Sequence, residues 1–166
     1  MAALVSVAAF AVVGGSVLAY LATLPPIGWR PLVMPTVFRE ECGACHWAYH
    51  PSLLPAASWR GLMHGLEDHF GEDASLDTDV AVAITDFLTA NAAETWDTEA
   101  ANRFRIVALE APGRITATPY WRRKHQEIPD AVFAHPEVGS KGACNACHHD
   151  ADSGRFDDQM IRIPKE

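Results

Sequence analysis

Hydrophobic and polar positions along the chain begin with one long apolar run. Residues 2–24 contain no charged side chain, and about 20 apolar residues are enough to span a bilayer as a helix. Pro25 and Pro26 follow directly, so the helix should end there. A secretory signal usually has basic residues before an apolar stretch of about 7–15 residues, and no basic residue precedes this run. We therefore expect a retained membrane span.

Helical periodicity predicts two helices in the first half of the chain that follows. In residues 58–71 the apolar side chains recur on one face, with Ser58 placed as an N-cap and Gly71 just past the last turn. Residues 78–92 show the same period, and Asp77 can cap them. The stripe of the first helix consists of Trp59, Leu62, Met63, Leu66 and Phe70.

The second half predicts one further helix over residues 118–128. Thr118 is a good N-cap, proline is favoured at the next position, and Pro129 should end the helix. The pattern weakens over residues 102–115, and we expect a short extended piece at residues 103–107. The chain is therefore predicted to be mostly α-helical.

These elements divide the chain into an anchor and two small domains. The roughly 135 residues after the apolar run suit one compact domain or two small ones. We expect an anchor and interfacial linker in residues 1–30, a first domain in 31–100 and a second in 101–166, with the boundary somewhere in 93–113.

Composition and charge narrow the function. The chain is 49% hydrophobic and 20% charged, which is typical of a globular protein. Its net charge of −8 argues against nucleic acid or an anionic lipid surface as the main partner. A partner with a basic docking face would fit, although an acidic balance also serves solubility alone.

The strongest motif is C-x-x-C-H, which occurs at Cys42–His46 and again at Cys144–His148 and uses all four cysteines of the chain. This motif is typical of c-type haem attachment. Two thiols three residues apart lie on one side of a helical turn, so both can add to vinyl groups of one porphyrin. The cysteines are Cys42 and Cys45 in the first motif and Cys144 and Cys147 in the second, and His46 and His148 would be the proximal iron ligands.

A zinc site is the alternative for paired cysteines, but the two pairs lie about 100 residues apart, against a usual gap of about 15–20. Zinc also leaves the histidine after each pair unexplained. Covalent haem is attached after export, so both motifs should lie outside the cytoplasm. Arg30 and Arg39 after the apolar run favour the opposite orientation, but two basic residues are a weak topological signal.

Each haem iron is either bound by a second side chain on the face opposite the proximal histidine or left open to a substrate. In the first predicted helix His69 lies at the edge of the apolar stripe beside Leu62, whereas His64 falls on the polar side. A haem ligand must lie on the face that buries the porphyrin. His69 is therefore the preferred ligand, and Met63 is its rival.

For the second haem, His125 shares a helix face with Trp121 and Ile128. His135 is the rival ligand, in a predicted loop. We expect His149 and His50 to be surface residues near the haem edges. The basic run Arg122, Arg123 and Lys124 is predicted to face solvent.

Taken together, these features resemble the diheme cytochrome c family over about residues 38–164. Besides the two C-x-x-C-H motifs, the resemblance rests on Ala48-Tyr49, Leu53-Leu54-Pro55, Ser58-Trp59, Asp68-His69-Phe70-Gly71, Thr118-Pro119-Tyr120-Trp121, Lys124-His125, Gly154-Arg155-Phe156 and Ile163-Pro164. It implies two mostly helical haem domains, the first similar to small soluble cytochromes c, with two covalently attached haem c groups. It also implies bis-histidine ligation, in agreement with His69 and His125.

We therefore expect an electron carrier and not an enzyme, because histidine on both faces leaves no iron position open. The alternative is a dihaem peroxidase or reductase with one open site. The family implies a membrane redox complex or b-type cytochrome as donor, and a small soluble or oxygen-binding cytochrome as acceptor. The expected location is the bacterial inner membrane, with a single span and the haem domains in the periplasm.

Overall fold

The computed structural model describes residues 16–17, 20, 28–106 and 113–164. Within these residues, no helix has the length and apolar character needed to cross a membrane. Most of the expected span in residues 2–24 lies outside the described part of the chain. The anchor therefore stays a prediction.

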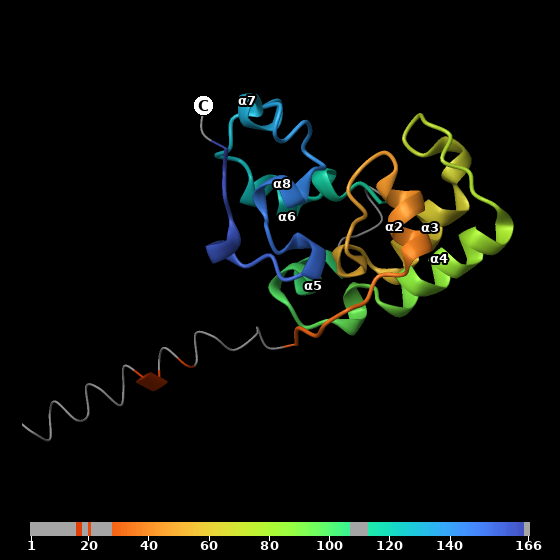
Figure 1. Cartoon of the computed structure of the whole chain (residues 1–166), viewed down its shortest axis with the longest axis horizontal. Coiled ribbons are helices and arrows are strands. Elements are labelled where there is room, and N and C mark those ends of the chain that lie inside the picture. The colour runs from red at the N-terminus through yellow and green to blue at the C-terminus, as the bar shows by residue number, and fades with distance from the viewer. Residues whose placement is uncertain (1–15, 18–19, 21–27, 107–112, 165–166) are drawn as a thin grey trace, which may run out of the picture.

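The described chain is mostly helical, as predicted, and its only β-pairing consists of the isolated bridges His69–Glu72 and His148–Ile161. Figure 1 shows α2, α3 and α4 gathered at one end of the molecule and α6, α7 and α8 at the other, with α5 between them. Six short 3₁₀ turns complete the fold at residues 51–53, 66–68, 93–95, 115–117, 151–153 and 158–160. The helices are α2 (Thr36–Gly43), α3 (Ala56–His64), α4 (Thr78–Ala90), α5 (Glu99–Phe104), α6 (Pro119–Lys124), α7 (Asp130–Phe133) and α8 (Cys144–Cys147).

One hydrophobic cluster extends from α2 through α3 and α4 to α5 and the 115–117 turn. Trp59 anchors α3 in it, and its indole Nε1 donates a hydrogen bond of 2.8 Å to the Pro51 carbonyl. Side chains of the second half, Trp121 and Phe156 among them, pack against the same cluster. The cluster therefore joins both halves of the chain, and the domain division at residue 100 stays a prediction. Its buried members are Phe38, Leu53, Leu54, Trp59, Ile84, Leu88, Ala92, Ala100, Phe104 and Ile115.

The predicted helix over residues 58–71 is wrong at both ends. α3 begins at Ala56, directly after Pro55, and ends at His64. Gly65 follows as the C-cap residue, its N–H bonded to the Leu62 carbonyl. Glycine is a poor helix former, so the chain leaves the helix there, and the last helical residue, His64, comes six residues before Phe70, the end of the apolar stripe.

The other predicted helices are confirmed with shorter bounds. α4 begins after Asp77 as expected, although the Asp77 side chain makes no cap hydrogen bond. In α6 the Thr118 hydroxyl accepts a hydrogen bond from the Trp121 N–H at 3.2 Å, and the helix ends at Lys124, before His125.

The expected extended piece at residues 103–107 is wrong. Its first two residues belong to α5, whose residues Ala100, Ala101 and Phe104 are buried. Thr98 caps this helix by accepting a hydrogen bond from the Ala101 N–H at 3.3 Å. A side-chain cap and a buried face, neither weighed in the sequence, therefore set the helix, and residue 107 lies outside the described chain.

His50 is fully buried, so its predicted surface position is wrong. Its Nδ1 lies 2.8 Å from the Ser52 hydroxyl oxygen and accepts a hydrogen bond from the Ser52 N–H, and its ring meets Trp96 edge-on at 4.9 Å between centroids. Burial, together with the charge of Arg30, lowers the pKa of His50 to about 4. His50 is therefore a neutral packing residue.

Residues just after the expected anchor bind both halves of the molecule. The Trp29 indole donates a 2.8 Å hydrogen bond to the Ser153 carbonyl. The Arg30 guanidinium donates a 3.0 Å bond to the Thr95 carbonyl and lies 4.4 Å from the centre of the Trp96 ring. The chain is therefore fixed to the folded body from Trp29 onwards.

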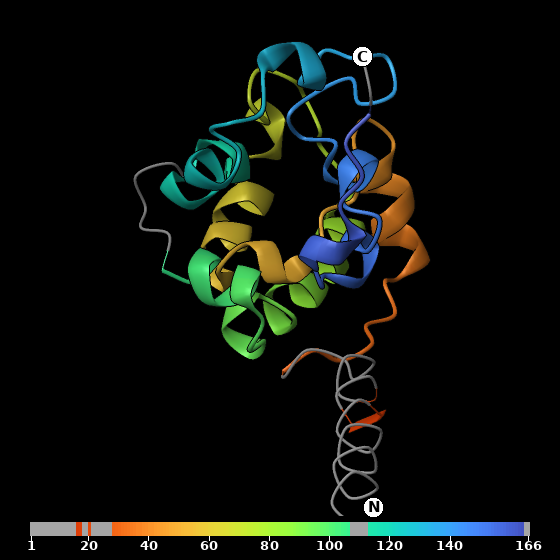
Figure 2. The same cartoon turned by 90° about the vertical axis from the view of Figure 1, so that its left-hand side faces the viewer.

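Figure 2 shows the C-terminal segment in blue beside the segment of the first motif in orange.

Candidate haem-binding sites

The first C-x-x-C-H motif lies where α2 ends. Cys42 belongs to the last turn of the helix, and Cys45 is exposed in the turn that follows. The His46 Nδ1 lies 2.7 Å from the Trp47 carbonyl oxygen. Since a carbonyl can only accept, Nδ1 carries the proton and Nε2 is left free to bind a metal.

His69 lies opposite His46, at 6.2 Å between ring centroids and with an angle of 23° between the ring planes. A tight turn presents His69, because its N–H donates to the Glu72 carbonyl at 2.8 Å and the Glu72 N–H donates back at 3.3 Å. Within the turn Phe70 has a left-handed φ of 59° and Gly71 a φ of 101°. The candidate ligand His69 therefore lies close to His46, but it lies in a turn and not on the helix that the sequence predicted.

The second motif forms the short helix α8, with His148 at its C-cap. His125, at the C-cap of α6, lies 6.1 Å from His148 between ring centroids. The His125 Nδ1 donates to the Trp121 carbonyl at 2.9 Å, and its ring stacks on the Trp121 indole with 4.3 Å between centroids. His125 therefore also keeps Nε2 free for a metal.

The spacing within each histidine pair can be tested against an iron between the two rings. A histidine nitrogen binds a metal at about 2.0–2.1 Å, and ring bonds of roughly 1.33 Å place each nitrogen about 1.15 Å from the ring centre. Two imidazoles on opposite sides of one iron should therefore have centroids about 6.3–6.5 Å apart. The observed separations of 6.2 and 6.1 Å lie just below this range.

A cavity of about 360 Å³ adjoins the second pair. Both motif cysteines, both histidines and a largely apolar wall line it, the wall including Phe104, Ile115, Val132, Phe133 and Ile161. A porphyrin needs an apolar surround of this kind, so the residues present fit a haem.

Burial favours the uncharged forms of the site residues. It lowers the pKa of His69, His125 and His148, so these imidazoles stay neutral, as metal binding requires. Burial also raises the pKa of the Cys42 thiol to about 11, helped by Glu41, and that of Cys144 to about 12. Among the described residues, no three histidine, cysteine or acidic side chains come together as in a zinc site.

The rival candidates make other contacts or face solvent. Met63 packs against the hydrophobic cluster, His64 is exposed, and the His135 Nδ1 accepts a hydrogen bond from the Glu137 N–H at 3.2 Å. His149 is exposed, as predicted. The basic run in residues 122–124 is also exposed as predicted, and Lys124 forms an ion pair of 3.1 Å with Glu99.

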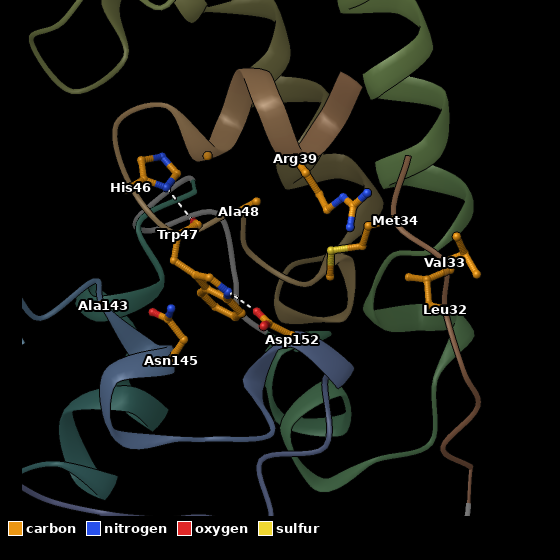
Figure 3. A pocket seen from close by; sticks show the side chains of 11 residues that line it. Leu32, Val33, Met34, Arg39, His46, Trp47, Ala48, Ala143, Asn145 and Asp152 are labelled. Carbon is orange, nitrogen blue, oxygen red and sulfur yellow. Dashed lines mark hydrogen bonds between the residues drawn. The ribbon is translucent and has the colours of Figure 1, made fainter. Parts of the chain in front are cut away.

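Sequence reasoning missed the residues that connect the two sites. The Trp47 indole donates a hydrogen bond to Asp152, and its ring meets Tyr49 at 5.2 Å and Phe156 at 6.5 Å between centroids. Phe156 in turn lies 5.3 Å from His148. Both motifs line one groove of about 580 Å³ at this junction, shown in Figure 3. The one sequence signal was the position of Trp47 directly after the first motif.

Comparison with known proteins agrees with this geometry. The sequence profile of the family Dihaem cytochrome c matches residues 38–156. The chain belongs to this family. A search of curated protein sequences finds no match.

Solved dihaem cytochromes c have the same fold. The X-ray structure of the diheme cytochrome type c from Shewanella baltica is 38% identical, with a TM-score of 0.62, and the match covers 79% of this chain and 95% of that one. Diheme cytochrome c from Rhodobacter sphaeroides is 39% identical with a TM-score of 0.62, covering 76% of this chain and 100% of that one. As a dihaem cytochrome c, this protein carries two covalently bound c-type haems.

Proposed function

We propose that this dihaem cytochrome c is an electron carrier in which histidine ligates each haem iron from both faces. Cys42 and Cys45 would attach the N-terminal haem, which His46 and His69 ligate. Cys144 and Cys147 would attach the C-terminal haem, which His125 and His148 ligate. The observation that carries the proposal is the pair of imidazole separations, 6.2 and 6.1 Å.

Each bound haem supplies an iron that takes up or gives up one electron. Four imidazoles would hold the two irons, and those of His46 and His125 are oriented by the carbonyls of Trp47 and Trp121. A dihaem peroxidase or reductase needs one iron with an open position, and the proposed ligand set leaves none. Outer-sphere electron transfer is therefore the function that this arrangement serves best.

The apolar N-terminus suggests where in the cell the electron carrier is located. We propose that residues 1–30 anchor it in the bacterial inner membrane with the haem domains in the periplasm. Only Pro25, Pro26, Ile27 and Gly28 separate the expected span from Trp29, which is bound to the folded body. Such a carrier would take electrons from a membrane redox complex or b-type cytochrome and pass them to a small soluble or oxygen-binding cytochrome.

The ligand set can be tested on the full-length protein with both haems attached. We expect low-spin spectra from both ferric haems by electron paramagnetic resonance (EPR), and no change in the ferrous visible spectrum with carbon monoxide. A high-spin signal or rapid carbon monoxide binding in the wild-type protein would instead favour the enzyme.

Membrane attachment can be tested by cell fractionation. The full-length chain should remain with the membranes until detergent is added. A chain that begins at Gly28 and follows a cleavable export signal should appear in the periplasmic extract with both haems. Recovery of full-length protein in that extract without detergent would contradict the anchor.

A further inference from the structure

Asp150 carries a buried carboxylate oxygen that makes no hydrogen bond with any of the described residues. The residue is 9% exposed and follows His148 by two positions. Its Oδ2 accepts a 2.9 Å hydrogen bond from the Asp157 N–H, which fixes the side chain. Its Oδ1 is buried and has no hydrogen-bond partner among the residues that the structure describes. A buried, unpaired acceptor is costly, so this oxygen calls for an explanation.

His148 also has a buried side-chain atom without a hydrogen bond. Its Nδ1 is buried and also has no partner among the described residues. A neutral imidazole that binds iron through Nε2 carries its proton on Nδ1, so this atom is a donor in need of an acceptor. His46 and His125 instead donate to backbone carbonyls. A donor and an acceptor, both buried and both unpaired, thus lie two residues apart in the chain. Two other buried nitrogens near the sites, His69 Nδ1 and Arg155 Nε, also have no partner among the described residues.

The charges around the two histidine pairs differ in sign. Burial lowers the pKa of His148, and the carboxylates of Asp150 and Asp158 oppose that shift. At the first pair, burial lowers the pKa of His69, and the Arg114 guanidinium adds to that shift. Lys124 acts on His125, but Glu99 neutralises much of its charge through their ion pair. A buried aspartate, Asp150, thus lies near the second pair, whereas a guanidinium, that of Arg114, lies near the first.

We propose that Asp150 accepts a hydrogen bond from His148 Nδ1 and thereby makes the C-terminal haem the one with the lower reduction potential. The inference rests on the proposed ligand set and deepens it. A carboxylate acceptor raises the basicity of the ligand imidazole and stabilises ferric iron more than ferrous iron. The carbonyl acceptor of His46 carries no net charge, so the N-terminal haem lacks this effect. In the protein reduced by one electron, the electron is then mostly on the N-terminal haem. In the fully reduced protein, the C-terminal haem is oxidised first.

Asp150→Asn tests the proposal in the full-length protein with both haems. Asparagine has the same shape and keeps a carbonyl oxygen for the Asp157 N–H, while the negative charge is lost. We expect the reduction equilibrium of the C-terminal haem to shift about tenfold toward the ferrous form, which is about 59 mV for one electron. A redox titration followed by EPR should also show changed g-values for that haem alone. The N-terminal haem should shift by less than twofold.

Asp152→Asn is the matched control. It removes the same charge two residues further along the same turn, but its carboxylate is exposed and binds the Trp47 indole instead of His148. An equal shift in the control, or no shift in Asp150→Asn, would overturn the proposal. Should Asp150→Asn fail to fold, the wild-type potentials decide, since an N-terminal haem of lower potential also contradicts it. If the wild-type protein shows no low-spin EPR signals, the proposed set of histidine ligands is wrong instead.

Discussion

His125→Ala should make the C-terminal haem high-spin and leave the N-terminal haem low-spin, and His69→Ala should do the reverse. Each substitution removes one imidazole of a pair, at 6.1 and 6.2 Å between ring centroids. The remaining proximal histidine and the two thioether bonds keep the haem in place. The iron then has an open position, which changes its spin state and admits a small ligand.

EPR and carbon monoxide binding report this change directly. In each variant, half of the haem should give a high-spin ferric signal, and the same half should bind carbon monoxide when ferrous. His125→Ala has the further use of identifying the C-terminal haem in a titration. The haem that responds to it is the one that Asp150→Asn should shift.

The histidines that compete for these positions supply the controls. His135→Ala removes a side chain whose Nδ1 accepts from the Glu137 N–H, and His64→Ala removes an exposed one. Both variants should keep two low-spin haems. Met63→Leu should do so too, since Met63 packs in the hydrophobic cluster. A high-spin haem in any of these three, with His69→Ala and His125→Ala unaffected, would move the ligand assignment to that residue.

The haem motifs could be predicted because their chemistry is local. Two cysteines and a histidine within five residues define one attachment site, whatever the rest of the chain does. Helix α6 could be predicted for a similar reason, since the Thr118 cap and the proline after it act within one turn. The resemblance to the dihaem cytochrome c family likewise rested on short sequence motifs.

The surroundings of the sites could not be predicted, because distant residues form them. His50 follows the first motif closely, yet Trp96 and Gly154 bury it from 46 and 104 residues away. Asp150 is likewise buried in a turn closed by the Asp157 N–H. His69 was chosen as the partner of His46 from a helical stripe that Gly65 interrupts. Periodicity therefore placed His69 near the apolar face, but it did not predict the turn in which His69 lies.

Gly154→Ala should weaken the contact between the two halves of the molecule more than any other small substitution considered above. Gly154 has a left-handed φ of 69°, and a Cβ there would lie 2.5 Å from both Cε1 and Nδ1 of His50. The backbone strain costs about 1–2 kcal/mol, and overpacking a buried site costs about 1–3 kcal/mol. The His50 ring cannot yield easily, because Ser52 and Trp96 hold it on two sides.

Gly139→Ala separates the two effects. Gly139 has a similar φ of 79°, but no atom lies within 4 Å of a Cβ built there. It should therefore show the backbone cost alone, about 1–2 kcal/mol, in urea unfolding of the protein with both haems attached. Gly154→Ala should lose about 3 kcal/mol of unfolding free energy, the strain and overpacking together. Equal losses in the two variants would mean that His50 can move aside, and that its contact with Gly154 does not hold the two halves together.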